Sequence, residues 1–130
     1  MPFLLYDYLS AQGENMIAAW IKGLQPTERA KLNQKLDMLR MSGDVLIPNT
    51  LSPTDQPGIL KIRVHGKIQL RPLLCRGPLN PGSEFTMLAG ATEVGSKLRP
   101  KDVMQVAIER KNEVTADPVN RRTLNERSKK

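Results

Sequence analysis

The sequence is poor in the residue types that form disulfides, zinc sites and aromatic clusters. Its 130 residues include one cysteine, one histidine, one tryptophan, two tyrosines and two phenylalanines. A single cysteine excludes an internal disulfide, and Cys75 together with His65 cannot complete the ligand set of a structural zinc site. We therefore expect Cys75 to be a small core residue, and we expect neither a metal nor a small-molecule cofactor.

Long apolar runs are also missing. No stretch approaches the roughly 20 apolar residues of a transmembrane helix. The N-terminus lacks a charged region followed by a small-residue cleavage site. We therefore expect a cytoplasmic protein that does not act at a membrane.

Positive charge is concentrated in the second half of the chain. The net charge is +7 at pH 7, and residues 1–58 hold 5 Lys/Arg and 6 Asp/Glu, whereas residues 59–130 hold 15 and 7. This asymmetry favours a polyanionic partner, either nucleic acid or an acidic protein, over an acidic small molecule. A solvated basic face with a basic tail is the simpler alternative.

The strongest local pattern lies in residues 58–76, GILKIRVHGKIQLRPLLCR. Between residues 60 and 65 apolar and basic side chains alternate, which is typical of a half-buried antiparallel strand. Gly66 interrupts the alternation and indicates a turn. The pattern predicts a β-hairpin with one apolar face and one basic face.

The hairpin register follows from matching its two apolar faces. A three-residue connection over 65–67 pairs Val64 with Ile68 and Lys61 with Arg71. Two cations placed opposite each other destabilise a sheet unless an anion lies between them. The predicted register therefore gives the first indication of an anion-binding face.

The N-terminal part predicts a strand followed by two helices. Residues 3–9, FLLYDYL, are almost continuously apolar, so this strand is expected in the centre of the sheet. Apolar residues recur at helical spacing over residues 14–24 and again after Pro26, which suits a first helical position. Gly43 is expected just past the end of the second helix, so the two helices form a helical hairpin.

The C-terminal part predicts a further strand over residues 85–90 and a helix that begins near Pro100 and ends after Asn112. Residues 115–130 contain few apolar side chains and many charges, and we expect this basic tail to be disordered. The prediction for residues 1–114 is one α+β domain with a small curved antiparallel sheet, an N-terminal helical hairpin packed against it, and a C-terminal helix.

In this order of elements the chain resembles the RelE/HigB superfamily of toxin proteins, in particular its phage-derived branch. Four segments carry the resemblance: LDMLRMSGDVLIP at 36–48, GILKIRV at 58–64, FTMLAG at 85–90 and KDVMQVAIERKNEV at 101–114. The last of these is similar to the closing Ala-x-x-Arg helix of the family, with Ala107 and Arg110 in those places. The resemblance implies a RelE-like fold and the toxin component of a type II toxin–antitoxin system.

Such toxins are typically endonucleases that cut mRNA on the ribosome and that a cognate antitoxin protein neutralises. Cleavage without a metal requires a base for the 2′-hydroxyl, cations for the phosphate and an acid for the leaving oxygen. The resemblance places Arg63 and Arg71 on the phosphate. His65 is either the group that transfers the proton or a solvated turn residue.

Other cations are candidates for binding the RNA phosphates. They share a position on or near the basic hairpin face or on the segment before the last helix: Lys61, Lys67, Arg76, Lys97 and Arg99.

The chain also departs from the family. The family has Leu-His-Gly-Phe and two lysines where this chain has Leu-Ala-Gly-Ala-Thr-Glu-Val, at residues 88–94. The alternative interpretation is a non-catalytic phage or prophage protein of the same fold that binds nucleic acid or an acidic host protein. In both cases the basic hairpin face is a suitable docking surface for an acidic segment of a partner.

Overall fold

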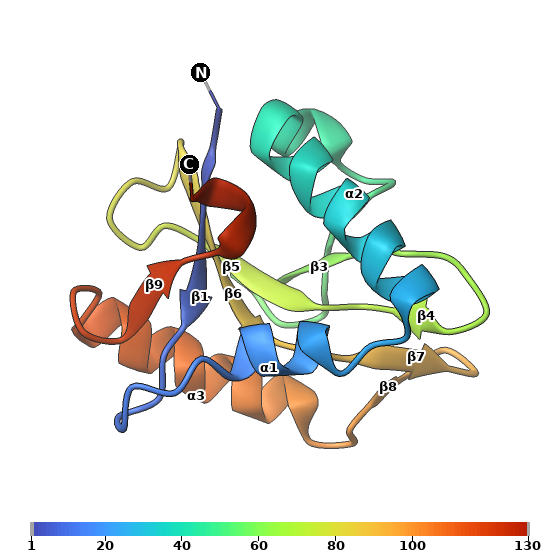
Figure 1. The fold of residues 1–130 in the computed structure, drawn as a ribbon. Coiled ribbons are helices and arrows are strands. Elements are labelled where there is room, and N and C mark those ends of the chain that lie inside the picture. The colour runs from blue at the N-terminus through green and yellow to red at the C-terminus, as the bar shows by residue number, and fades with distance from the viewer. Residues whose placement is uncertain (1, 130) are drawn as a thin grey trace.

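The computed structural model describes residues 2–129, and Met1 and Lys130 lie outside the described part. Within it the chain is an α+β protein with helices packed on two β-sheets (Figure 1). In chain order the elements are β1 (Leu4–Tyr8), α1 (Met16–Lys22), α2 (Pro26–Ser42), the 3₁₀ helix η1 (Gly43–Leu46), β2 (Leu51–Pro53), β3 (Leu60–Ile62), β4 (Gln69–Leu70), β5 (Leu73–Arg76), β6 (Glu84–Ala89), β7 (Thr92–Val94), β8 (Lys97–Arg99), α3 (Val103–Ala116), β9 (Arg122–Leu124) and the 3₁₀ helix η2 (Glu126–Ser128). The α+β class expected from the sequence is confirmed.

The larger sheet has the strand order β2-β3-β5-β6-β1-β9, and a smaller sheet has the order β4-β7-β8. β1 pairs in parallel with β6, with Leu5 opposite Phe85, whereas its other neighbour β9 is antiparallel. The sheet is therefore mixed, and the expectation of a purely antiparallel sheet is wrong, because α1 and α2 carry the chain away before β6 returns alongside β1. The first strand is interior, as its apolar sequence suggests, but it lies next to the edge strand β9 and not at the centre of the sheet.

Local sequence explains where α1 and α2 begin and end. The Asn15 side chain accepts a hydrogen bond from the backbone N–H of Ala18 at 2.8 Å and caps α1. Pro26 is the first residue of α2, as predicted. Gly43 ends α2 with φ of +53°, and a Cβ there would lie 2.3 Å from the Phe3 ring, so only glycine fits.

Two apolar cores lie on opposite faces of the larger sheet. One is packed under α1 and α2, and its members include Ile17, Leu32, Leu36, Leu39, Ile62, Val64, Leu74 and Phe85. The other lies under α3, and its members include Ile59, Leu73, Cys75, Leu88, Ala91, Val103 and Ala107. Cys75 is buried as expected, and burial raises the pKa of its thiol to about 11.

The hairpin has a different register from the predicted one. Val64 pairs with Leu70, not with Ile68, through reciprocal backbone hydrogen bonds of 3.1 and 3.0 Å. Lys61 lies opposite Leu73, so it does not face Arg71. A shift of two residues keeps every side chain on the same face, so the apolar pattern alone does not choose between these registers.

The predicted disorder of residues 115–130 is also wrong for its described part, residues 115–129. α3 extends to Ala116, β9 joins the sheet beside β1, and η2 follows. Arg122 supplies the main anchor of this segment: it forms an ion pair with Glu84 at 2.7 Å and lies 3.6 Å from the centre of the Tyr6 ring. The segment is held by polar and cation–π contacts, which a count of apolar residues does not register.

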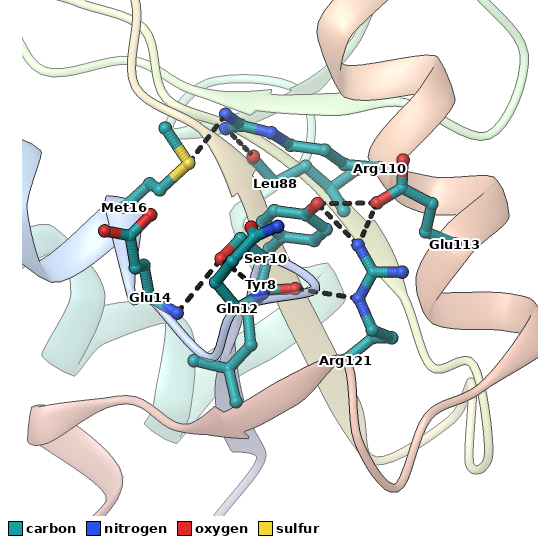
Figure 2. A network of polar contacts seen from close by, with 10 residues as sticks. Tyr8, Ser10, Gln12, Glu14, Met16, Leu88, Arg110, Glu113 and Arg121 are labelled. Carbon is teal, nitrogen blue, oxygen red and sulfur yellow. Dashed lines mark hydrogen bonds and ion pairs between the residues drawn. The ribbon is translucent and has the colours of Figure 1, made fainter.

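A second set of contacts joins the same segment to β1 and α3 (Figure 2). The Tyr8 hydroxyl donates to Glu113 Oε1 at 2.5 Å and accepts from Arg121 at 2.8 Å. The Arg110 guanidinium lies 4.8 Å from the centre of the Tyr8 ring and donates to the backbone oxygen of Leu88. Arg110, which the resemblance singled out, therefore has a structural role between α3 and β6.

Candidate functional site

The basic residues of β3 lie on the sheet face opposite α1 and α2. Ile62 and Val64 are buried in the core under those helices. Side chains alternate along a strand, so Lys61 and Arg63 are directed to the other face, where α3 packs. That face also carries the buried Leu73, opposite Lys61, and Cys75, so the side of the hairpin away from α1 and α2 is partly apolar and not wholly basic as predicted.

A cleft of about 440 Å³ opens on that face between the segment after β2, the β7–β8 hairpin and the start of α3. Three lysines and two carboxylates line it: Lys61, Lys97, Lys101, Asp55 and Glu93. We call it the lysine cleft. None of the ion pairs found within residues 2–129 involves these lysines, so their ammonium groups are available to an anion from solvent.

Arg71 lies at the border of the lysine cleft, but it is only 3% exposed. Its Nε donates to Glu93 Oε1 at 3.2 Å, its Nη1 to the backbone oxygen of Leu70 at 2.8 Å, and its Nη2 to Gln69 Oε1 at 3.1 Å. A buried guanidinium needs such partners, because an unpaired charge in the interior is strongly destabilising. Direct phosphate binding requires a guanidinium that solvent can reach. The guanidinium of Arg71 is buried, so the predicted phosphate contact of Arg71 is not available in this structure.

Gln69 orients the ring of His65 through a contact with Nδ1. The Gln69 Nε2 donates to the backbone oxygen of Gly66 at 2.8 Å, and its Oε1 accepts from Arg71, so the orientation of the amide is determined. His65 Nδ1 lies 3.0 Å from the same Oε1. An amide oxygen only accepts hydrogen bonds, so Nδ1 carries the proton and Nε2 of the neutral ring has a free lone pair.

A continuous chain of polar contacts thus runs from the exposed ring of His65 through Gln69 and Arg71 to Glu93 in the lysine cleft. It crosses between β4 and β7, in which Gln69 lies opposite Glu93. From the sequence, Glu93 has the wrong sign for a phosphate site. In the structure its carboxylate compensates the buried charge of Arg71.

The remaining predicted residues lie elsewhere. Arg76 pairs with Asp44 and lies 5.6 Å from the centre of the Phe85 ring. Lys67 is exposed and lines a separate hollow with Lys31 of α2. Arg99 is exposed on β8 and is not part of the cleft lining. The predicted set is therefore spread over several surfaces.

Arg63 is half-buried, and its backbone N–H donates to the oxygen of Thr50 at 2.8 Å. Its Nε is buried without a hydrogen-bond partner among the described residues. Arg29 and Arg40 have the same buried Nε without a partner, so this feature does not single out Arg63 as a phosphate-binding residue.

Two of the cleft lysines, Lys61 and Lys97, were among the residues predicted from the sequence. Lys101 and Gln69 were not, and the ion pair of Glu93 with Arg71 was not expected either. The signal for Lys101 was its position next to Pro100, where the last helix was predicted to begin, close to the candidate cations Lys97 and Arg99. Gln69 and Glu93 meet only through the pairing of β4 with β7, and no local pattern in the sequence reports a pairing of segments so far apart.

A second cavity of about 260 Å³ lies between α1, α2 and the C-terminal segment, away from the lysine cleft. Asp7 at its wall accepts hydrogen bonds from Asn15 at 3.0 Å and from Asn125 at 2.7 Å. Burial raises the pKa of the Asp7 carboxyl above its ordinary value. Both asparagines also cap helices, so Asp7 connects α1 to the C-terminal segment.

Within residues 2–129 no group of three or more His, Cys, Asp and Glu side chains is arranged to hold a metal ion. The helices of this part of the chain are all too short or too polar to cross a membrane. Comparison of the chain with family models, with curated proteins and with solved structures found no match.

Proposed function

We propose that this chain is a RelE-like toxin of a type II toxin–antitoxin system that cleaves mRNA on the ribosome without a metal ion. The observation that supports this proposal best is the contact of His65 Nδ1 with Gln69 Oε1 at 3.0 Å, which orients the ring and leaves Nε2 as the nitrogen with the lone pair when the ring is neutral. The polar chain through Gln69 and Arg71 connects that base to a cleft with three unpaired lysines. A base and a set of cations are the two requirements of 2′-hydroxyl attack.

In the proposed reaction the 2′-oxygen bonds to phosphorus while the bond from phosphorus to the 5′-oxygen breaks. His65 Nε2 takes the proton of the 2′-hydroxyl, and a lysine ammonium of the cleft gives a proton to the leaving 5′-oxygen. The other lysines of the cleft stabilise the charge on the phosphate oxygens. Arg71 is a positioning residue, because it holds Gln69 and through it the His65 ring.

Three variants test this proposal. We expect induced expression of the wild type to arrest growth and to create new mRNA 5′ ends, and His65→Ala to reduce cleavage by about 10²–10⁴-fold. Lys61→Gln/Lys97→Gln should weaken RNA binding and cleavage together. Lys35→Gln, on α2 and outside the cleft, is the matched control. Full cleavage by His65→Ala would exclude His65 as the base.

The partners of this proposal are mRNA, the ribosome and a cognate antitoxin, and the site of action is the cytoplasm. An acidic segment of the antitoxin fits the lysine cleft, because the unpaired lysines there attract carboxylates as well as phosphates. Antitoxin binding should then protect Lys61 and Lys97 from acetylation by a lysine reagent. Unchanged reactivity of both lysines in the complex would place the antitoxin on another surface.

One observation favours a second candidate, a non-catalytic phage or prophage protein that grips nucleic acid or an acidic host protein. Arg71 is buried and satisfied by protein acceptors, which leaves the cleft without the guanidinium that the resemblance assigns to the phosphate. This candidate predicts salt-sensitive RNA binding that depends on the cleft lysines, without any cleavage. New 5′ ends that disappear in His65→Ala would exclude it.

A further inference from the structure

The lysine cleft is the first of three hollows that follow one another along α3. Its lining includes Asp55 on one side and Met104 on the other. The next hollow, of about 90 Å³, is lined by Pro57 and Ile108, one turn further along the helix. The third, of about 290 Å³, shares Lys111 with the second. The three hollows form a row beside α3 and residues 53–60, with Arg76 of β5 at the third, and we call this row the α3 groove.

The two ends of the α3 groove are positive and its middle is neutral. The first end has the lysines of the lysine cleft, and the far end has Lys111 and Arg76. Arg76 is paired with Asp44, whereas Lys111 forms none of the ion pairs found within residues 2–129. Between the ends, the lining apart from the shared Lys111 consists of side chains without charge: Gln56, Pro57, Ile59, Ile108 and Asn112.

The backbone at Gly58 leaves room for the Lys111 ammonium. Gly58 has φ of +82°, and a Cβ at this position would lie only 2.8 Å from Lys111 Nζ. The Lys111 side chain therefore lies directly against the turn that separates β2 from β3. The ammonium is held at the wall of the groove without a carboxylate to neutralise it, an arrangement that favours an anionic ligand.

The length of the α3 groove fits a short piece of a single nucleic acid strand. A rise of about 1.5 Å per residue places Lys111 about 12 Å along α3 from Val103, the first residue of the helix. A stacked strand advances about 3.4 Å along its axis for each phosphate, and a stretched strand advances further, so this span covers roughly two to four nucleotides.

We infer that the α3 groove binds a single RNA strand, with Lys111 as a second phosphate-binding group at the far end from the lysine cleft. This inference rests on the proposed function, because it extends the path of the same RNA beyond the site of cleavage. None of the five aromatic residues lines the groove, so it offers no platform on which bases stack. Binding along it therefore rests on the lysine contacts with phosphates, which carry no direct sequence information.

The test uses a fluorescein-labelled 2′-O-methyl oligouridylate of about eight nucleotides, within the usual range of single-strand site sizes. This probe has no free 2′-hydroxyl, so binding is measured without cleavage. Its affinity is measured by anisotropy over a series of salt concentrations. Lys111→Gln should lower the slope of log affinity against log salt by about 0.7, the amount expected for one phosphate contact on a single strand.

Two further variants make the test specific. Asn112→Lys adds a charge to the middle of the groove and should raise both the affinity and the slope. Lys35→Gln removes the same charge from α2 and should leave both unchanged. A Lys111→Gln protein with the wild-type slope and a wild-type thermal transition would overturn the inference.

The inference and the proposed function fail in different ways. One outcome is a smaller slope of log affinity against log salt in Lys111→Gln while the wild type does not cleave unmodified mRNA. This outcome supports RNA binding in the α3 groove and excludes the endonuclease. The opposite outcome is cleavage that depends on His65 while Lys111→Gln keeps the wild-type salt slope. This outcome supports the endonuclease and excludes RNA binding along the α3 groove. A wild-type protein that does not bind the oligouridylate at all overturns the inference.

Discussion

Arg122 and Glu84 form an ion pair of 2.7 Å in which the two side chains are only 4% and 3% exposed. The pair joins β9, near the end of the chain, to β6 in the middle of the sheet. Thr86 and the backbone oxygen of Gly77 lie within hydrogen-bond distance of the same guanidinium nitrogen. The contact fixes the C-terminal segment to the body of the protein.

We expect Arg122→Met to destabilise the protein by about 3–5 kcal/mol, because it leaves the Glu84 carboxylate buried without its partner. The double variant Arg122→Met/Glu84→Gln should recover most of this loss, since no buried charge remains. Urea unfolding followed by circular dichroism measures both. Lys129→Met, which removes an exposed pair with Glu126, is the control and should change stability by less than about 1 kcal/mol. An equally unstable double variant would contradict the prediction.

The contribution of the Asp7 carboxyl to the free energy of unfolding should decrease as the pH rises, the opposite of what a carboxylate in an ion pair gives. Burial raises its pKa above the ordinary value of 3.8, so the native state binds this proton more tightly than the unfolded chain does. The contribution of Asp7 is therefore most favourable below that value and decreases as the pH rises through the native pKa.

The measurement for Asp7 is the free energy of unfolding of the wild type minus that of Asp7→Asn, followed from acid to neutral pH. We expect the difference to fall as the pH rises and then to become constant. Asp55→Asn, on the turn after β2, serves as the control for removing an exposed carboxylate. A difference that rises with pH would show that Asp7 is stabilised in its charged form.

Gln69→Leu should release the His65 ring while conserving the size of the side chain. Without the Gln69 oxygen nothing requires the proton to stay on Nδ1, so both neutral tautomers become populated. Nitrogen chemical shifts of the His65 imidazole report the tautomer directly. Lys67→Gln changes the same loop without touching this contact and should leave the tautomer as it is. An Nδ1-protonated ring in Gln69→Leu would exclude the positioning role of Gln69.

Gly58→Ala should destabilise the protein by about 1 kcal/mol and weaken RNA binding. The residue has φ of +82°, which costs energy for any residue with a Cβ, and the new methyl group displaces the Lys111 ammonium. Gly82→Ala is the matched control, because a Cβ at Gly82 meets no atom within 4 Å and the backbone there is not left-handed. Equal RNA affinity in the two variants would separate Lys111 from RNA binding.

Sequence patterns predicted the elements of the fold better than their pairing. The helical stripe after Pro26, the end of that helix at Gly43 and the alternation through β3 are local signals, and each was found where expected. The hairpin register was not predictable in the same way, because a shift of two residues leaves both faces unchanged.

Two predictions failed for the same reason: the disorder expected for the C-terminal segment and the phosphate contact expected for Arg71. Arg122 becomes an anchor only because Glu84 and Tyr6 meet it, and Arg71 becomes internal only because β4 pairs with β7. From sequence alone a charged side chain is expected at the surface, because charged residues are rarely buried without a partner. Here the partners are far away in the sequence, so the sequence does not indicate the burial. Lys61, by contrast, lines the lysine cleft without a distant partner.

The outer strands of the larger sheet are β2 and β9, and each has only three residues. β2 ends with Pro53, which has no backbone N–H to offer to another strand. β9 begins with Arg122, whose side chain points inward to a carboxylate. Short edges with a proline or an inward charge resist pairing with strands of other molecules. Both edges of the larger sheet are therefore closed to pairing, which would limit aggregation if a polyanion brought many copies of this basic chain together.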